Sequence, residues 1–196
     1  MTRLLKLIGG VLRRDWLTYR LQITVITGVL LTSAIMMRSG AVEFARGTAA
    51  GGLVAAAFIY GQAGFANERG RGTLKQLLRM AANPFDAVVA KYLSMYSMVL
   101  FSANLAGLVY GQWRLLLWAD AAVLLLSTLF MASAVISENP GAAHMPIVLL
   151  ILIAIPLKNA TAFLSANATI LSVAAAVFSL TLAVVSALIF ARDQRA

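Results

Sequence analysis

Long runs of apolar residues, separated by short charged segments, form the main pattern along this chain. All but one of the runs contain the roughly 17 to 25 residues that an α-helix needs to cross a bilayer. The exception lies between Pro146 and Pro156, and irregular backbone at membrane depth is tolerated only where protein or a cavity covers it. The pattern predicts six transmembrane helices, with a re-entrant element before the last. The runs cover about residues 21–37, 49–66, 87–110, 115–136, 145–157 and 169–191.

The segment before the first run has a different, amphipathic pattern. Drawn as a helix at about 100° per residue, residues 3–20 place five basic side chains within one arc of roughly 120°, opposite an apolar arc. We predict that residues 1–20 form an amphipathic helix on an anionic membrane surface, with Arg13 and Arg14 on its basic face. Asp15 falls on the apolar arc. It either meets a partner in another helix or lies in water at a frayed helix, and the pattern leaves both open.

A second short amphipathic segment separates the second and third runs. Thr73 and Gln76 have the spacing of a capping box, with Thr73 as the N-cap residue. Leu74, Leu77 and Leu78 then repeat at helical spacing and form one apolar stripe. We predict a helix over residues 73–82, about 15 Å long at about 1.5 Å per residue. The leucine stripe has no evident surface of its own chain to pack on, which favours a contact with a partner.

The next helix has its own start signal. Asn83 can cap it, Pro84 suits its first position, and Asp86 lies in its first turn. The helix at 73–82 therefore lies between independent start and stop signals. Such rigid ends are typical of an element that transmits force.

Composition agrees with a membrane protein and excludes several classes of site. The chain is 61% hydrophobic and 12% charged, with a mean hydropathy of +0.88, whereas soluble domains are about half apolar and about a quarter charged. Without cysteine, it has no disulfide and no thiolate site. The single histidine, His144, cannot form a histidine pair. We therefore expect no catalytic, cofactor or metal site in this chain.

The net charge of +9 has a membrane explanation rather than a nucleic-acid one. Of the 16 lysines and arginines, twelve fall in the segments on the N-terminal side of the predicted membrane and four in those on the other side. Basic residues are enriched in cytoplasmic segments. We therefore predict that both termini are cytoplasmic. Residues 21–196 then form one transmembrane domain after the interface helix at 1–20.

The segment ANERGRGTLKQLLRMAANPFDAVVAKY, residues 66–92, resembles the cytoplasmic segment of the type-2 ABC (ATP-binding cassette) exporter permeases. That family pattern follows the second span and contains an acidic-basic pair, a Gly-Thr step, a leucine-rich turn, a proline link and a Lys-Tyr pair. The basic N-terminal helix, the six spans and the re-entrant element also fit the family. The matching residues are Glu68, Arg69, Gly72, Thr73, Leu74, Leu77, Leu78, Pro84, Lys91 and Tyr92.

The resemblance implies a function. The helix at 73–82 would be the coupling helix of a permease in the bacterial inner membrane, docking on a separate ATPase subunit that binds ATP and Mg²⁺. Two permease chains and two ATPase chains would form the exporter. A narrower similarity to the compact haem exporter protein B branch leaves the role of haem open. The residues expected to contact the ATPase are Glu68, Arg69, Thr73, Leu74, Gln76, Leu77 and Leu78.

The sequence also bears on two other classes of function. A membrane-embedded enzyme needs clustered polar chemistry, but Asp120, Glu138 and Asn104 have no histidine or cysteine beside them. An ion-driven carrier or channel could use Asp120, because a carboxylate within a membrane span is a candidate functional group. A salt bridge with Arg114 or a solvated outer position is the other interpretation of Asp120. The sequence has no phosphate-binding loop of its own, so ATP hydrolysis would require a partner.

Overall fold

The computed structural model describes residues 2–110, 113–137 and 168–194, and all its regular elements are helical. This confirms the all-α fold for the described part of the chain. The predicted re-entrant element at 145–157 and His144 lie outside the described residues. The helices are α1 (Thr2–Thr18), α2 (Arg20–Arg38), α3 (Val42–Phe58), the π-helical turn η1 (Ile59–Ala63), α4 (Gly64–Gly70), α5 (Thr73–Met80), α6 (Pro84–Tyr110), α7 (Trp113–Ile136) and α10 (Ala168–Asp193).

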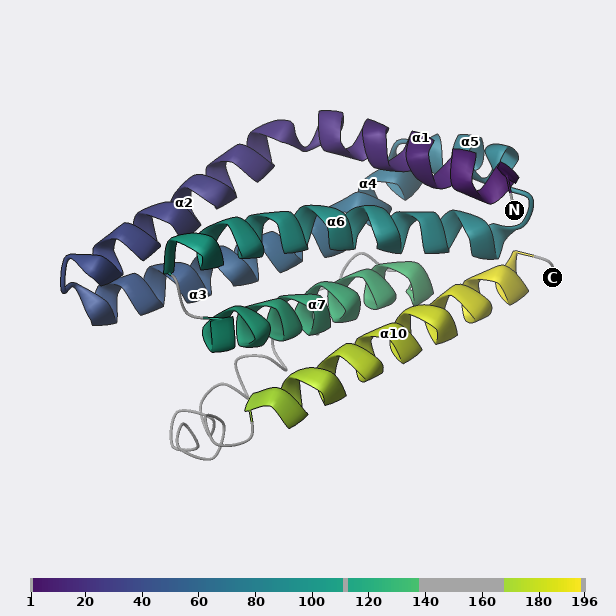
Figure 1. Ribbon diagram of the computed structural model, residues 1–196. Helices are drawn as coiled ribbons and strands as arrows, with labels where there is room; N and C mark the ends of the chain where they lie inside the picture. Colours follow the sequence, from purple (N-terminus) through teal and green to yellow (C-terminus); the bar gives the residue numbers. More distant parts are fainter. Residues whose placement is uncertain (1, 111–112, 138–167, 195–196) are drawn as a thin grey trace.

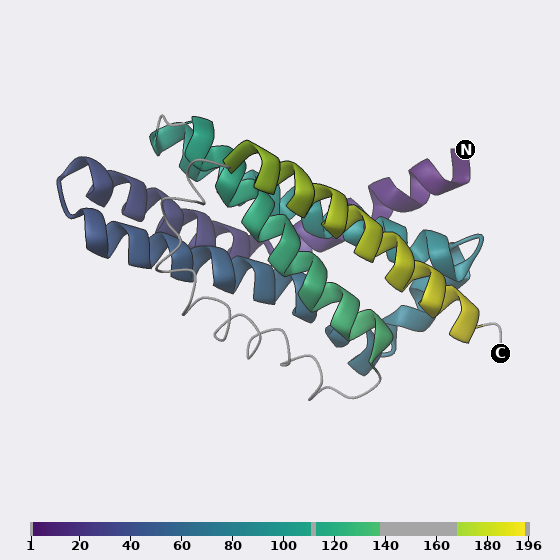
Figure 2. The ribbon, with the colours of Figure 1, turned by 90° about the horizontal axis from the view of Figure 1, so that it is seen from below.

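The long helices lie lengthwise in one bundle with two distinct ends (Figure 1). Both chain termini and the short helix α5 lie at one end, and the turn between α2 and α3 lies at the other (Figures 1 and 2). Helices α7 and α10 both run toward the end that holds the termini. The bundle therefore places the start of α1, the whole of α5 and the end of α10 together.

Helix α6 is the centre of the bundle. Side-chain hydrogen bonds connect it to α1, α2, α7 and α10, which are otherwise far apart in the sequence. The bonds are Trp16 Nε1 to Ser97 Oγ (3.0 Å), Thr27 Oγ1 to Ser102 Oγ (3.2 Å), Tyr96 Oη to Thr128 Oγ1 (2.8 Å) and Tyr92 Oη to Ser186 Oγ (2.7 Å). Because α6 spans 27 residues, about 40 Å at about 1.5 Å per residue, it can carry a displacement from one end of the bundle to the other.

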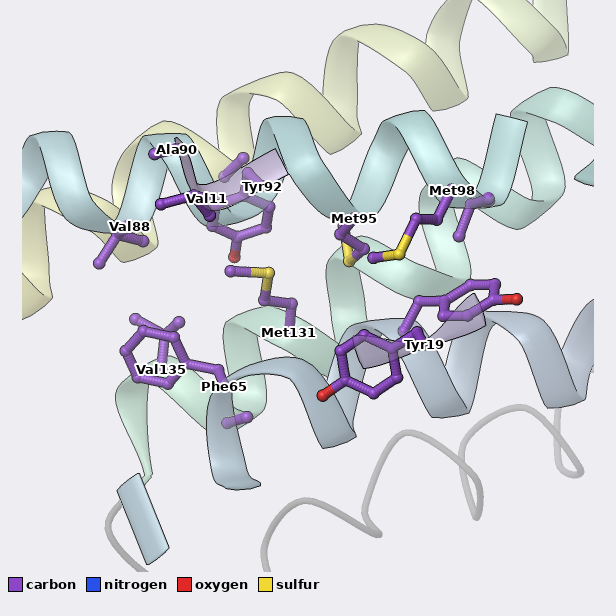
Figure 3. Close-up of a cluster of buried hydrophobic side chains, with 14 of the residues drawn as sticks. Val11, Tyr19, Phe65, Val88, Ala90, Tyr92, Met95, Met98, Met131 and Val135 are labelled. Carbon is purple, nitrogen blue, oxygen red and sulfur yellow. The ribbon is translucent and has the colours of Figure 1, made fainter. Parts of the chain in front are cut away.

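The apolar core lies around α6 and contains several flexible side chains. Met95 and Met98 of α6 and Met131 of α7 are buried beside Tyr19 and Phe65 (Figure 3). Methionine fills irregular gaps because its side chain is unbranched and flexible. The methionines therefore have a structural role as core residues.

A glycine allows close approach between η1 and α7. A Cβ atom on Gly61 would lie 2.6 Å from the carbonyl oxygen of Ser127 and 2.9 Å from Cβ of Phe130. Both distances are shorter than van der Waals contact, so only glycine fits here without a shift of the backbone. Small residues at helix contacts are typical of membrane helices.

Two helices of the described residues, Arg20–Arg38 and Thr169–Asp193, are long and apolar enough to cross a membrane by length and composition. Helix α10 has small residues inside and large apolar residues outside. Apart from Phe190, its buried side chains are small, namely Ser179, Ala183, Ser186, Ala187 and Ala191. Its exposed side chains include Ile170, Val173, Val177, Phe178, Leu180, Val184, Val185, Leu188 and Ile189. We call the second set the outer face of α10.

Candidate functional site

Four charged side chains from three helices meet beneath the N-terminal helix. Arg14 and Asp15 come from α1, Glu68 from α4 and Lys91 from α6. Lys91 Nζ lies 2.8 Å from Asp15 Oδ2 and 2.8 Å from Glu68 Oε1. Arg14 contacts both carboxylates, 3.3 Å from Asp15 Oδ1 and in direct contact with Glu68 Oε1. We call these four residues the ion cluster.

The ion cluster is buried and electrically balanced. Only 3% of the Lys91 side chain is exposed, and the two carboxylates are almost as buried. Two cations and two carboxylates cancel, which a buried position requires because an unpaired buried charge is very costly. Arg14 lies at the edge, with 36% of its side chain exposed. The cluster therefore ties α1, α4 and α6 together at one point.

The position of Asp15 resolves the alternative that the sequence left open. Its partner in another helix is Lys91, 76 positions away in the sequence, and Asp15 is buried rather than solvated. The predicted site residues did not include Lys91 as an ionic partner. The available signal was a single lysine within an apolar helical run, which needs a carboxylate nearby when it is buried.

Arg69 stabilises the end of α7. Its guanidinium donates to the carbonyl oxygen of Ser137 at 2.6 Å and, over longer distances, to those of Ala134 and Val135. The last carbonyl groups of a helix lack partners within the helix, and a cation there also interacts favourably with the helix dipole. The guanidinium carbon also lies 5.8 Å from the ring centre of Phe65. Glu68 and Arg69, expected as partner contacts, thus both have binding partners in their own chain.

The start of α5 differs from the sequence prediction. Gly72 is the N-cap residue, with φ of 71°, and no side chain caps the helix. Thr73 is the first helical residue, and its hydroxyl donates to the carbonyl oxygen of Glu68 at 3.4 Å. The predicted capping box of Thr73 and Gln76 is therefore wrong. The physical reason is the turn after α4, whose left-handed backbone at position 72 suits glycine.

The two faces of α5 have different surroundings. Leu74 and Leu77 are buried in the bundle core, and Leu77 has an exposed fraction of 0%. Leu78 is partly buried against the same core. The leucine stripe packs on the bundle of its own chain, so the prediction that it has no such surface is wrong. The exposed side chains of α5 are Lys75, Gln76, Arg79 and Met80.

Helix α5 ends at Met80, two residues before the predicted end at 82, and α6 begins at Pro84 as predicted. The side chain of Asn83 accepts a hydrogen bond from the backbone N–H of Asp86 at 2.8 Å. This confirms Asn83 as the cap of α6. The proline link is therefore short and well defined, and it fixes α5 to the central helix.

The N-terminal helix packs on the bundle with its apolar arc. Leu7 and Val11 are buried, and Trp16 packs on α6, where its ring meets the edge of Phe101. Arg13 is exposed. Helix α1 therefore has one face on its own chain and a basic face directed away from the core.

Asp120 does not belong to the ion cluster, and its contact on α6 lies 13 positions after Lys91. Asn104 of α6 donates to both of its carboxylate oxygens, at 3.1 and 3.2 Å. The other groups considered with it, Arg114 and Glu138, have no described side chain. Among the described residues, no group of three or more His, Asp or Glu side chains could hold a metal ion.

Comparison of the chain with protein-family models, with curated proteins and with solved structures finds no significant match. The features that point to a function are therefore the geometry of the ion cluster and of α5 and the sequence pattern of residues 66–92.

Proposed function

We propose that this chain is the membrane-spanning permease subunit of an ATP-binding cassette exporter, and that α5 docks on a separate ATPase subunit. The observation that carries the proposal is the setting of α5. It is a short helix at the end of the bundle that holds both termini, fixed from behind by Leu77 and presenting Lys75 and Gln76 outward. A docking element needs this combination of a rigid base and an accessible polar face.

The distribution of apolar side chains supports a membrane location. The outer face of α10 and exposed Leu21, Val25 and Ile35 of α2 would form large apolar patches in water. Soluble monomers rarely expose such patches, which mark membrane or protein contacts. Small residues inside and large apolar residues outside are expected where lipid replaces water. The outer face is also available to the second permease chain.

The directions of the helices support six crossings. Helices α2 and α3 form an antiparallel hairpin, α6 and α7 run in opposite directions, and α7 and α10 are parallel. Because α7 and α10 run in the same direction, a further crossing is needed between them, and the sequence predicts one at residues 145–157. With both termini at one end, the positive-inside rule assigns that end to the cytoplasm.

The ion cluster supports mechanical coupling. Glu68 lies at the end of α4, just before the turn into α5, and its partners lie on α1 and α6. A force on α5 therefore reaches α6 through the Asn83 cap and through Lys91. Because α6 is bonded to α1, α2, α7 and α10, its motion would rearrange the whole bundle.

The composition of the spans indicates the class of cargo. The spans are rich in Ala, Leu, Val, Ser and Met, which suits a hydrophobic or amphipathic substrate. ATP and Mg²⁺ would bind to the ATPase chains, two per pair of permeases, and this chain would catalyse no reaction itself. Haem export, as in the haem exporter protein B branch, is one specific form of this proposal.

The test is affinity purification of the full chain from its native host in mild detergent, with its stoichiometric partners identified by mass. We expect a soluble subunit with a phosphate-binding loop. The double substitution Lys75→Glu/Gln76→Glu on the outer face of α5 should release it. Arg13→Glu/Arg20→Glu, which reverses exposed charges outside α5, is the matched control and should retain it.

Two results would count against the proposal. A chain that purifies alone at every detergent strength would indicate an ion-driven carrier or channel, the alternative that uses Asp120. In that case Asp120→Asn should abolish transport, whereas the permease proposal expects only a modest effect, because asparagine preserves the shape of the side chain. Release of the subunit by the control pair alone would place the docking surface around the junction of α1 and α2.

A further inference from the structure

A groove of about 650 Å³ lies between α1 and the segment formed by the end of α5 and its link to α6. Its walls carry four basic side chains, those of Arg3, Lys6 and Arg14 from α1 and Arg79 from α5. Leu7, Val11 and Met80 line its apolar part. Its volume falls within the range of about 300 to 1,000 Å³ that is usual for ligand pockets.

The charge in this groove is unbalanced. Arg14 is neutralised by the carboxylates of the ion cluster. Arg3, Lys6 and Arg79 form no ion pair with any described residue, and no acidic side chain is among the described residues that line the groove. Three uncompensated cations facing one space repel one another. An anion placed between them would attract all three and offset that repulsion.

The chemistry of the lining selects the kind of anion. Two arginines and a lysine around one space are suited to a phosphate group, because guanidinium groups bind phosphate oxygens in pairs and lysine adds a point charge. The apolar side of the groove favours a phosphate attached to an apolar body. Helix α1 is also the part of the chain expected to lie at the membrane surface, where anionic headgroups are present.

We propose that the groove between α1 and α5 binds a phosphate group through Arg3, Lys6 and Arg79, and that this anion joins the N-terminal helix to α5. The phosphate can belong to a phospholipid headgroup or to a free phosphate compound. The inference does not depend on α5 docking an ATPase, because every residue in it belongs to this chain. A bound anion would hold the basic side chains of α1 that line the groove against α5.

The test uses the full chain, purified in non-ionic detergent and stripped of lipid. Three probes are titrated by calorimetry: inorganic pyrophosphate, short-chain phosphatidylglycerol and short-chain phosphatidylcholine. We expect phosphatidylglycerol to bind with saturation and phosphatidylcholine, whose headgroup is neutral overall, to bind much more weakly. Pyrophosphate binding in addition identifies a site for free phosphate as well, and phosphatidylglycerol binding alone identifies the lipid as the source.

A pair of matched variants separates a built site from diffuse attraction. Arg3→Gln/Lys6→Gln removes two cations from the groove, and Arg13→Gln/Arg20→Gln removes two exposed cations outside it. The groove variant should weaken binding at least about tenfold for each lost cation, and the control variant by much less. Both should keep the melting temperature of the native chain, because Arg3, Lys6, Arg13 and Arg20 are all exposed.

Three outcomes would overturn the proposal. Equal weakening by both variants would mean diffuse attraction to the basic surface, and equal binding of phosphatidylglycerol and phosphatidylcholine would mean that a net negative charge is not required for binding. If neither anionic probe binds while Arg3→Gln/Lys6→Gln releases a co-purifying acidic protein, the groove is a protein contact instead. Lys75→Glu/Gln76→Glu tests the proposed function alone, because neither residue lines the groove. Either proposal can therefore fail while the other holds.

Discussion

The part of the bundle around the ion cluster and α5, which we call the charged end, and helix α10 are held in place by different kinds of contact. At the charged end, α1, α4 and α6 meet through the ion cluster, whose geometry requires particular partners at particular distances. Helix α10 instead packs small residues against its neighbours and turns its large apolar side chains outward, and a hydrogen bond between Ser186 Oγ and Tyr92 Oη connects it to α6. Specific polar contacts fix one arrangement, whereas small-residue packing depends on close approach of the helices and not on particular polar partners.

Under the proposed function, this difference would correspond to separate roles for the charged end and for α10. A part that receives force from a partner has to keep its register, and buried ion pairs fix register because every alternative leaves a charge unpaired. A part that moves against lipid or against a second chain needs few specific bonds. Breaking each kind of contact separately should therefore give effects of very different size.

The largest effect is expected from Lys91→Met. It leaves two carboxylates facing only Arg14, and loss of one partner from a buried ionic group costs about 3–5 kcal/mol. The measurement is the free energy of unfolding in mixed detergent micelles. Lys75→Met, which removes an exposed lysine, is the control and should stay within about 0.5 kcal/mol of the native chain.

A second variant sharpens this result. Adding Glu68→Gln to Lys91→Met restores charge balance in the cluster, so part of the lost stability should return. If Lys91→Met is as stable as Lys75→Met, the cluster does not hold the charged end together.

Leu77→Ala should cost about 2–5 kcal/mol, because Leu77 is fully buried and its truncation leaves a cavity beneath α5. Met80→Ala on the same helix is the control, since 64% of Met80 is exposed. Thermal unfolding of the purified chain compares them. Equal stability of the two variants would show that α5 is not anchored by its leucines.

Gly61→Ala tests packing away from the charged end. The added Cβ would press on the backbone of Ser127, and overpacking of this kind costs about 1–3 kcal/mol. Gly51→Ala has nothing within 4 Å of its added Cβ and should be neutral or slightly stabilising. The same unfolding measurement applies, and a neutral Gly61→Ala would contradict the close approach of η1 and α7.

The smallest effect is expected on the outer face of α10. Leu180→Ala in detergent should change stability by no more than about 0.5 kcal/mol, because 59% of Leu180 is already exposed. Ala187→Leu on the opposite, buried face should cost about 1–3 kcal/mol. If Leu180→Ala is the more damaging of the two, the face assigned to lipid is instead buried in an assembly.

Local signals predicted the helices well, because helix limits depend on neighbouring residues. The cap at Asn83 is an example, since Asn83, Pro84 and Asp86 act within one turn. Helix α1 ends at Thr18, close to the expected 20, and α5 starts at the expected Thr73. The failure at the Thr73 cap comes from the preceding turn, because the left-handed Gly72 already starts the helix.

The candidate site was less predictable because its contacts join distant segments. The odd position of Asp15 on an apolar arc indicated a partner, but no local pattern identified Lys91. Likewise, the stripe of Leu74 and Leu77 had the spacing of a buried face, and the sequence could not tell whether its own bundle or a partner covers it. In both cases the periodicity identifies which face of a helix is buried, but it does not identify the element that covers that face.

The most direct test concerns which side of the membrane the charged end faces. The chain has no cysteine, so single cysteines at Lys75 and at Ser39, in the turn between α2 and α3, can be labelled cleanly with a membrane-impermeant maleimide. Our account predicts that Ser39→Cys reacts in intact cells and that Lys75→Cys reacts only after the membrane is opened. Labelling of Lys75→Cys in intact cells, or recovery of the chain in the soluble fraction, would contradict a cytoplasmic α5 within reach of an ATPase.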